Sequence, residues 1–222
     1  MMDERKLSLY LVTDPVLCGP RGVRETCRQA LAAGVGTVQL RDKDASTREL
    51  LRVALELREL CTAAGALFIV NDRVDVALAS NADGVHLGLD DMPVGIARSL
   101  MGEDAVIGAS VRSSEEAAGA WRDGADYIAA NLVFATDTKT GLGRPLGLSG
   151  VRELRGASPL PLVAIGGIKA DNAAGVIRAG AAGIAVVSAI MAARDVSSAV
   201  ELLLRAMSPE PGGYREKSTP GR

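Results

Sequence analysis

The sequence is poor in aromatic residues, with one Trp, three Tyr and two Phe among 222 residues. That number is too small to build a surface on which nucleic-acid bases stack. No charge of one sign predominates, because 25 Lys and Arg face 27 Asp and Glu, for a net charge of −2. A balanced chain has no overall field that attracts nucleic acid or an anionic membrane. We therefore expect neither as a partner.

Cysteine is scarce and long hydrophobic runs are missing. Cys18, Cys27 and Cys61 are odd in number and form no CxxC pair, so we expect buried thiols and neither a disulfide framework nor a thiolate zinc site. The opening Met-Met-Asp-Glu-Arg-Lys has no apolar segment of the kind a signal peptide requires. The longest uncharged run, 179–193, is shorter than the ~20 residues of a membrane-spanning helix. These features predict a cytoplasmic protein.

Glycine is abundant, with 25 residues, which favours many tight connections between short elements over a helical bundle. Short apolar runs, typical of parallel strands buried on both faces, recur along the chain. They predict eight strands: Leu7–Thr13, Thr37–Leu40, Leu67–Val70, Gly84–Leu87, Val106–Ser110, Tyr127–Phe134, Leu162–Ile165 and Ile184–Val187.

Amphipathic segments alternate with these strands, and the clearest runs from Ser46 to Ala64 behind a Ser-Thr-Arg-Glu capping box. The other predicted helices are Val23–Ala32, Asp75–Ser80, Pro93–Leu100, Ser114–Arg122, Leu148–Arg155, Asp171–Ala179 and Val196–Met207. Eight strand–helix units in about 200 residues predict a single-domain α/β TIM (β/α)8 barrel over residues 1–207. The Pro- and Gly-containing residues 208–222 are expected to form a disordered tail.

Polar side chains gather where the predicted strands end. In a barrel these positions converge on one face, the C-terminal mouth that carries the active site. In chain order they are Thr13, Asp14, Gln39, Arg41, Asp42, Lys43, Asn71, Asp72, Arg73, His86, Asp90, Asp91, Ser110, Arg112, Asn131, Thr136, Asp137, Thr138, Lys139, the Gly166-Gly167 pair and Ser188.

The charged members of this set suit a diphosphate. Arg41, Lys43 and Lys139 are cations from separate loops, and Arg and Lys are the usual partners of phosphate oxygens. Asp72 and Asp91 are carboxylates of the kind that bind Mg²⁺ shared with substrate phosphates. The Gly166-Gly167 turn before a helix, beside Val187-Ser188 on the next loop, suits a second phosphate. We therefore expect a pocket for a Mg²⁺-bound diphosphate and a second anionic group.

Each motif also has a structural explanation when it is taken alone. Asn71-Asp72 or Asp90-Asp91 would suit a helix N-terminus, Gln39 to Lys43 a solvated turn with a local ion pair, and Gly166-Gly167 any tight strand-to-helix connection. His86, the only histidine, is expected to be a hydrogen-bonded core or rim residue rather than a catalytic base. The joint occurrence at strand ends favours a site.

Eight ordered motifs make the chain resemble the thiamine phosphate synthase family over about Leu9 to Ile190. They are Tyr10-Leu11-Val12-Thr13-Asp14, Val38-Gln39-Leu40-Arg41-Asp42-Lys43, Ile69-Val70-Asn71-Asp72-Arg73, Gly84-Val85-His86-Leu87-Gly88-Leu89-Asp90-Asp91, Gly108-Ala109-Ser110-Val111, Val133-Phe134-Ala135-Thr136-Asp137-Thr138-Lys139, Ala164-Ile165-Gly166-Gly167-Ile168 and Val186-Val187-Ser188-Ala189-Ile190. The resemblance implies that a hydroxymethylpyrimidine diphosphate and a thiazole phosphate combine to thiamine phosphate and diphosphate, by Mg²⁺-assisted dissociative substitution.

The resemblance also implies the role of each residue. Asp72 and Asp91 would bind Mg²⁺, and Arg41, Lys43, Ser110 and Lys139 would act directly on the leaving diphosphate. The pyrimidine diphosphate would contact Gln39, Arg41, Lys43, Asn71, Ser110 and Lys139. The thiazole phosphate would contact Thr136, Asp137, Thr138, Gly167, Val187 and Ser188.

Two other functions stay open at this point. A thiazole tautomerase on the same barrel would need a base at the mouth, and a non-catalytic phosphate-binding barrel would not need its Mg²⁺ ligands. The oligomeric state is also open, a homo-oligomer included.

Overall fold

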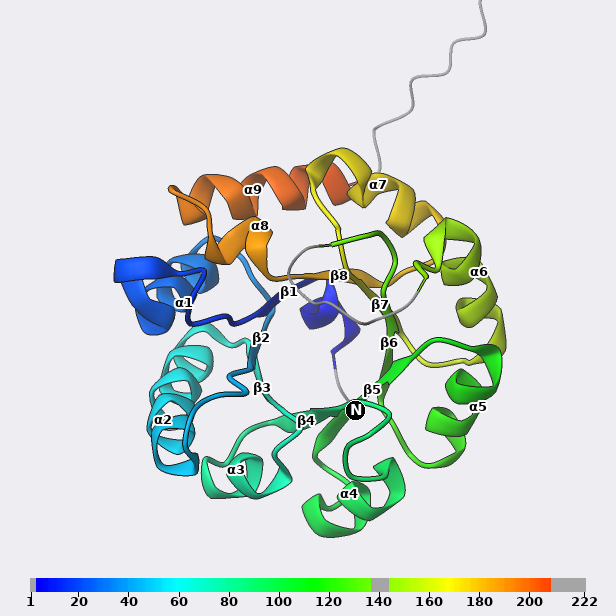
Figure 1. Cartoon of the computed structure of the whole chain (residues 1–222), viewed down its shortest axis with the longest axis horizontal. Helices are drawn as coiled ribbons and strands as arrows, with labels where there is room; N and C mark the ends of the chain where they lie inside the picture. The colour runs from blue at the N-terminus through cyan, green and yellow to red at the C-terminus, as the bar shows by residue number, and fades with distance from the viewer. Residues whose placement is uncertain (1–2, 137–143, 209–222) are drawn as a thin grey trace, which may run out of the picture.

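Eight parallel strands close into a barrel in the computed structural model, which describes residues 3–136 and 144–208 (Figure 1). Each strand pairs with its neighbour in the sequence, and the last pairs with the first through registers such as Tyr10 with Ala185. The strands are β1 Leu9–Val12, β2 Thr37–Leu40, β3 Leu67–Asn71, β4 Gly84–Leu87, β5 Val106–Val111, β6 Tyr127–Asn131, β7 Leu162–Ile165 and β8 Gly183–Val186. The predicted TIM barrel is confirmed.

Helices surround the barrel, as Figure 1 shows. They are α1 Gly22–Ala32, α2 Thr47–Ala64, α3 Val74–Ala79, α4 Val94–Met101, α5 Ser114–Arg122, α6 Gly147–Ala157, α7 Ala170–Arg178, α8 Ser188–Met191 and α9 Val196–Met207, with short 3-10 helices η1 Glu4–Leu7 and η2 Gly19–Arg21. The four-residue helix α8 was not predicted, because one turn is too short to show a helical period.

Helix α2 illustrates how the sequence sets these elements. The Ser46 hydroxyl caps its first turn by accepting from the Glu49 N–H at 3.3 Å, as the capping-box pattern predicts. The buried face repeats at helical spacing, and Gly65 ends the helix with a left-handed φ of 66°. That face consists of Leu50, Ala54, Leu57 and Cys61.

Strand residues alternate between two cores. In β1, Leu9 and Leu11 pack outward under the helices, whereas Tyr10 and Val12 point into the barrel. The inner core is filled rather than hollow, since every member is at most 8% exposed. Its members are Leu7, Tyr10, Val12, Leu67, Ile69, Val106, Tyr127, Val163 and Ala185.

Two strand boundaries differ from the prediction by more than one residue. The first strand begins at Leu9 rather than at Leu7, because Leu7 ends η1 and inserts its fully buried side chain into the inner core. The sixth strand ends at Asn131 rather than at Phe134. In both cases an apolar run continues past the strand, since a buried loop residue is as hydrophobic as a strand residue.

The three cysteines are free and buried, as predicted. Burial raises the pKa of the Cys61 thiol to about 12 and also raises that of Cys27 well above its usual range. Within the described ranges, no helix is both long and apolar enough to cross a membrane. Residues 209–222 lie outside those ranges, so the division into a domain of residues 1–207 and a tail of residues 208–222 stays a prediction.

Candidate active site

The predicted site residues that the structure describes stand at the C-terminal ends of strands or in the loops that follow them. Because all strands of the barrel run parallel, these ends share one rim. The residues are Gln39, Arg41, Lys43, Asn71, Asp72, Asp91, Ser110, Thr136, Gly167, Val187 and Ser188. Asp137, Thr138 and Lys139 lie outside the described residues.

Two carboxylates meet at this rim. Asp72, directly after β3, has a left-handed backbone with φ of 61°, and its N–H donates to the His86 carbonyl of the next strand at 2.9 Å. The Asp91 carboxylate comes from the loop after β4, where Oδ2 accepts from the Gly88 N–H at 2.7 Å. Burial and the adjacent Asp72 carboxylate raise the pKa of Asp91.

The donor set fits Mg²⁺. Neighbouring carboxylates repel each other unless a proton or a cation lies between them, and Asp72 already has the Lys43 Nζ at 3.3 Å from its Oδ2. Over the described part of the chain, no group of three or more His, Cys, Asp or Glu side chains could hold a metal. A cation here would have two protein carboxylates and would take its other ligands from water or substrate, as Mg²⁺ commonly does.

These two aspartates do not cap helices. Helix α3 has Arg73 at its N-cap and α4 has Pro93, and neither makes a side-chain capping bond. Lys43 pairs with Asp72 across the loops rather than forming an ion pair within its own turn. The N-cap explanation therefore does not hold for the two aspartates, whereas the positive φ values of Gly166 and Gly167 are what a tight strand-to-helix connection requires.

The Arg41 backbone is fixed by Thr13 from the neighbouring strand end. The Thr13 hydroxyl accepts from the Arg41 N–H at 2.9 Å and donates to the Arg41 carbonyl at 3.1 Å. Thr13 is 1% exposed, so these bonds are protected from water. A buried threonine thus sets where this cation leaves the sheet.

A chain of side-chain hydrogen bonds runs through the barrel interior below the rim. The Gln39 Nε2 donates to the Tyr10 hydroxyl at 2.7 Å, and the Tyr10 and Tyr127 hydroxyl oxygens are 2.9 Å apart. His86 then bridges two hydroxyls, with Nδ1 3.0 Å from Tyr127 and Nε2 3.0 Å from Ser110. The prediction that His86 is a hydrogen-bonded core or rim residue is confirmed. The two tyrosines were not predicted to have a role.

Gly108 makes this chain sterically feasible. It lies on β5 between His86 on one neighbouring strand and Tyr127 on the other. The Tyr127 ring crosses the strand at this glycine and stacks against the His86 ring, with centroids 5.6 Å apart. A Cβ at residue 108 would lie 2.1 Å from the Tyr127 Cζ, far inside van der Waals contact.

The loops after β7 and β8 supply backbone N–H groups near the rim. Gly167 has φ of +63°, and a Cβ there would lie 2.5 Å from the Ala135 carbonyl oxygen. Helix α7 begins three residues later at Ala170, and Ser188 is the first residue of α8. First-turn N–H groups have no acceptor within their own helix, and barrels of this type often bind phosphate at these loops.

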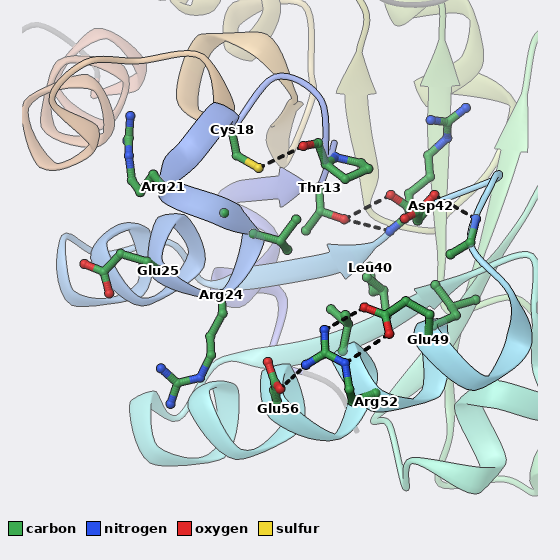
Figure 2. Close-up of a pocket in the computed structure, with 17 residues that line it drawn as sticks. Thr13, Cys18, Arg21, Arg24, Glu25, Leu40, Asp42, Glu49, Arg52 and Glu56 are labelled. Carbon is green, nitrogen blue, oxygen red and sulfur yellow. Dashed lines mark hydrogen bonds and ion pairs between the residues drawn. The ribbon is translucent and has the colours of Figure 1, made fainter.

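A cavity of about 500 Å³ lies beside the rim, between the loop after β1 and helices α1 and α2 (Figure 2). Arg41 lines it, together with Thr13 and Asp42 from the ends of the first two strands. Figure 2 shows Arg52 between Glu49 and Glu56, with Nη2 2.6 Å from the Glu49 carboxylate. Four arginines in the lining face four carboxylates, so the net field for an anionic ligand is small.

A family model and curated relatives point to the same family. The family model described as "Thiamine monophosphate synthase" matches residues 9–190. A thiamine-phosphate synthase of Chloroflexus aurantiacus is 52% identical over 195 residues, covering 88% of this chain and 90% of that protein. One from Moorella thermoacetica is 48% identical over 195 residues, covering 88% and 93%.

A solved structure matches as well. The thiamine phosphate pyrophosphorylase from Pyrococcus furiosus superposes with a TM-score of 0.84 at 46% identity, covering 92% of this chain and 96% of that chain. Together these matches give no support to a tautomerase or to a non-catalytic barrel. The chain therefore belongs to the thiamine monophosphate synthase family.

Proposed function

We propose that this chain catalyses the thiamine-phosphate synthase reaction, in which a hydroxymethylpyrimidine diphosphate and a thiazole phosphate give thiamine phosphate and diphosphate. Family membership and relatives of 48% and 52% identity support a transferase of this kind. The structural observation that carries the proposal is the pair of rim carboxylates, Asp72 and Asp91, with Lys43 3.3 Å from the first. That combination suits a leaving group that is both anionic and metal-bound.

The pyrimidine diphosphate would bind across the ends of β2 to β6. Arg41 and Lys43 would contact its phosphate oxygens from one loop, and Lys139 would do so from the loop after β6. Gln39, Asn71 and Ser110 would orient the molecule through uncharged hydrogen bonds. A position that holds the diphosphate among cations stabilises the charge that develops when the C–O bond breaks.

Mg²⁺ would be held by Asp72 and Asp91. When bound, it would neutralise negative charge on the diphosphate and so make that group easier to expel. The uncharged side chains of Gln39, Asn71 and Ser110 would have a separate function, because they would orient the pyrimidine diphosphate without competing for the metal.

The thiazole phosphate would occupy the opposite side of the mouth. Thr136, Asp137 and Thr138 would line its site from the loop after β6. Gly167, Val187 and Ser188 would bind its phosphate through backbone N–H groups and a hydroxyl, at the loops after β7 and β8. This arrangement would hold the thiazole nitrogen facing the pyrimidine methylene carbon.

Bond exchange needs no covalent intermediate with the protein. The diphosphate leaves with the electron pair of the C–O bond, and the aminopyrimidine ring stabilises the resulting positive charge on the methylene carbon. The thiazole nitrogen then supplies the electron pair of the new C–N bond. The protein contributes positioning and leaving-group stabilisation. We further propose that the reaction takes place in the reducing cytoplasm, where three free thiols are stable.

The direct test is a diphosphate-release assay with both substrates, with and without Mg²⁺. We expect release to require both substrates and the metal. The Asp72→Ala and Lys139→Ala substitutions should each lower turnover about a hundredfold, if each group supplies ~3 kcal/mol at the transition state. Near wild-type single-turnover rates for both variants would refute the residue assignment.

The loop after β4 provides a matched control. Asp91→Asn removes one of the paired carboxylates, whereas Asp90→Asn makes the same chemical change at the exposed neighbouring residue. We expect Asp91→Asn to raise the Mg²⁺ concentration needed for half-maximal rate at least about tenfold, the loss typical of a weakened metal site. Asp90→Asn should leave that concentration unchanged. Equal responses of the two variants would contradict a metal site at Asp91.

A further inference from the structure

The interior hydrogen-bond chain from Gln39 to Ser110 has a direction, and this direction determines what Ser110 offers to a ligand. The chain joins five side chains from five strands, with heavy-atom distances from 2.7 to 3.0 Å. Among the described residues, the only buried side-chain nitrogen or oxygen without a hydrogen-bond partner is the Arg21 Nη1, which is not part of the chain. Each buried tyrosine proton therefore needs an acceptor among its neighbours.

The assignment starts at Gln39. Its amide donates to the Tyr10 oxygen, so the single Tyr10 proton is available for the Tyr127 oxygen 2.9 Å away. If Tyr127 donated to Tyr10 instead, the Tyr10 proton would have no acceptor in a site that is 1% exposed. Burial raises the pKa of both tyrosines, so both keep their hydroxyl protons and act as donors.

The same argument continues through the histidine. The Tyr127 oxygen accepts from Tyr10, so the buried Tyr127 proton has no acceptor unless it is donated to the His86 Nδ1. A neutral imidazole that accepts at Nδ1 carries its proton on Nε2, which donates to the Ser110 oxygen. The Ser110 proton is then not used within the chain and can be donated at the barrel mouth.

We propose that Tyr10, Tyr127 and His86 are positioning residues that fix His86 as the Nε2–H tautomer and thereby make the Ser110 hydroxyl a hydrogen-bond donor to the pyrimidine diphosphate. The ligand part of this inference rests on the proposed function. Phosphate oxygens and pyrimidine ring nitrogens are acceptors only, so they need a donor at this position. A Ser110 that donated its proton to His86 would present lone pairs to them instead.

The direction of the Ser110 hydroxyl matters because only one of its two orientations attracts an anionic oxygen. A hydroxyl that donates to an anionic oxygen makes a charge-assisted bond, whereas one whose lone pairs face that oxygen repels it. Gly108 contributes indirectly. Because residue 108 has no Cβ, the Tyr127 ring can lie across this position and reach His86. The inner core and the substrate site are therefore one hydrogen-bonded unit.

The tautomer can be measured without any activity assay. His86 is the only histidine of the chain, so the protein labelled with ¹⁵N-histidine and freed of any purification tag gives the spectrum of a single imidazole ring. In long-range ¹H–¹⁵N correlation spectra at neutral pH, we expect a protonated Nε2 and an unprotonated Nδ1. A protonated Nδ1 would mean that the Gln39 amide is turned round and every donor reversed, and an imidazolium would mean that both nitrogens donate. Either result would overturn the inference.

The Tyr127→Phe variant tests the link to the substrate. Removing this hydroxyl frees Nδ1, so His86 should change from one tautomer to a mixture, and the KM for the pyrimidine diphosphate should rise about tenfold, the effect of one misdirected hydrogen bond. The KM for the thiazole phosphate should stay within about twofold. Thr37→Val is the matched control, because its buried hydroxyl donates to the Lys6 carbonyl at the other end of the barrel and is not part of the chain.

The outcomes separate the two proposals. A Tyr127→Phe variant that folds, as its thermal transition would report, yet keeps the wild-type tautomer and KM would refute the positioning role. A KM increase of the same size in Thr37→Val would also refute it, since the effect would then reflect general loosening of the barrel. Wild-type protein with the expected spectrum but no diphosphate release would disprove the proposed function and the ligand part, while the tautomer assignment would stand.

Discussion

The Gly108→Ala substitution adds a single methyl group at a crowded point of the inner core. The new Cβ would lie 2.1 Å from the Tyr127 Cζ and 2.3 Å from its hydroxyl oxygen. Ordinary carbon contacts are about 3.5–4.0 Å, so the ring has to move by about 1.5 Å. A movement of that size breaks the bonds of the Tyr127 hydroxyl to Tyr10 and His86, which are 2.9 and 3.0 Å long.

The cost follows from three contributions. Overpacking a core costs about 1–3 kcal/mol, and each lost buried hydrogen bond adds about 1 kcal/mol. Replacing glycine by alanine returns about 0.4–1 kcal/mol by restricting the unfolded chain. The net loss is about 3 kcal/mol, which for a domain of this size lowers the Tm by about 6–12 °C. The KM for the pyrimidine diphosphate should rise as well, because the chain that directs Ser110 is interrupted.

Calorimetry on Gly108→Ala beside Gly156→Ala gives a matched pair. Gly156 lies in α6, and a Cβ there would meet no atom within 4 Å. The control should raise the free energy of unfolding by about 0.5–1 kcal/mol, opposite in sign to the core variant. An unchanged or higher Tm for Gly108→Ala, with an unchanged KM, would show that the inner core accommodates the methyl group and that the reasoning is wrong.

Four further outcomes are expected. Ser46→Ala removes the cap that accepts from the Glu49 N–H at 3.3 Å, so the free energy of unfolding from urea titration should fall by about 1 kcal/mol. Lys43→Met should change that free energy by less than about 1 kcal/mol, since the side chain is 54% exposed, yet it should raise the KM for the pyrimidine diphosphate, and the reverse pattern would assign it a structural role. A thiol reagent at mild pH should label Cys27 and Cys61 only after denaturation, because burial keeps their pKa high; rapid labelling of the native protein would contradict this. The two interior tyrosines have raised pKa values, so above about pH 10 only the unfolded chain releases their protons, and the free energy of unfolding should fall by up to ~2.7 kcal/mol per pH unit; urea midpoints that do not change with pH in this range would refute it.

The barrel could be predicted from the sequence because its strands are buried on both faces. Such strands appear as short apolar runs, and all eight were found at nearly the observed positions. Two boundaries were wrong by more than one residue, and for the same physical reason. Leu7 and the residues after Asn131 are as buried as strand residues, and hydrophobicity does not report whether a backbone pairs with a neighbour.

The rim residues could also be predicted, since position at a strand end is a local property. Asp72 and Lys43 do lie together, with the Lys43 Nζ 3.3 Å from the Asp72 Oδ2. The interior chain could not be predicted in this way, because the Tyr10–Tyr127 contact joins residues 117 positions apart across the barrel. One signal was available, namely a polar aromatic at an inward position of two otherwise apolar strands, and such a residue usually finds a buried partner.

The sealed lower end of the barrel has a consequence for catalytic turnover. Leu7 and the tightly filled inner core leave no passage through the middle of the molecule. Both substrates must therefore enter, and both products leave, through the C-terminal mouth of the barrel. Because substrates enter and products leave through the same mouth, a product that stays bound prevents the next substrate from binding. We therefore expect inhibition by accumulated product.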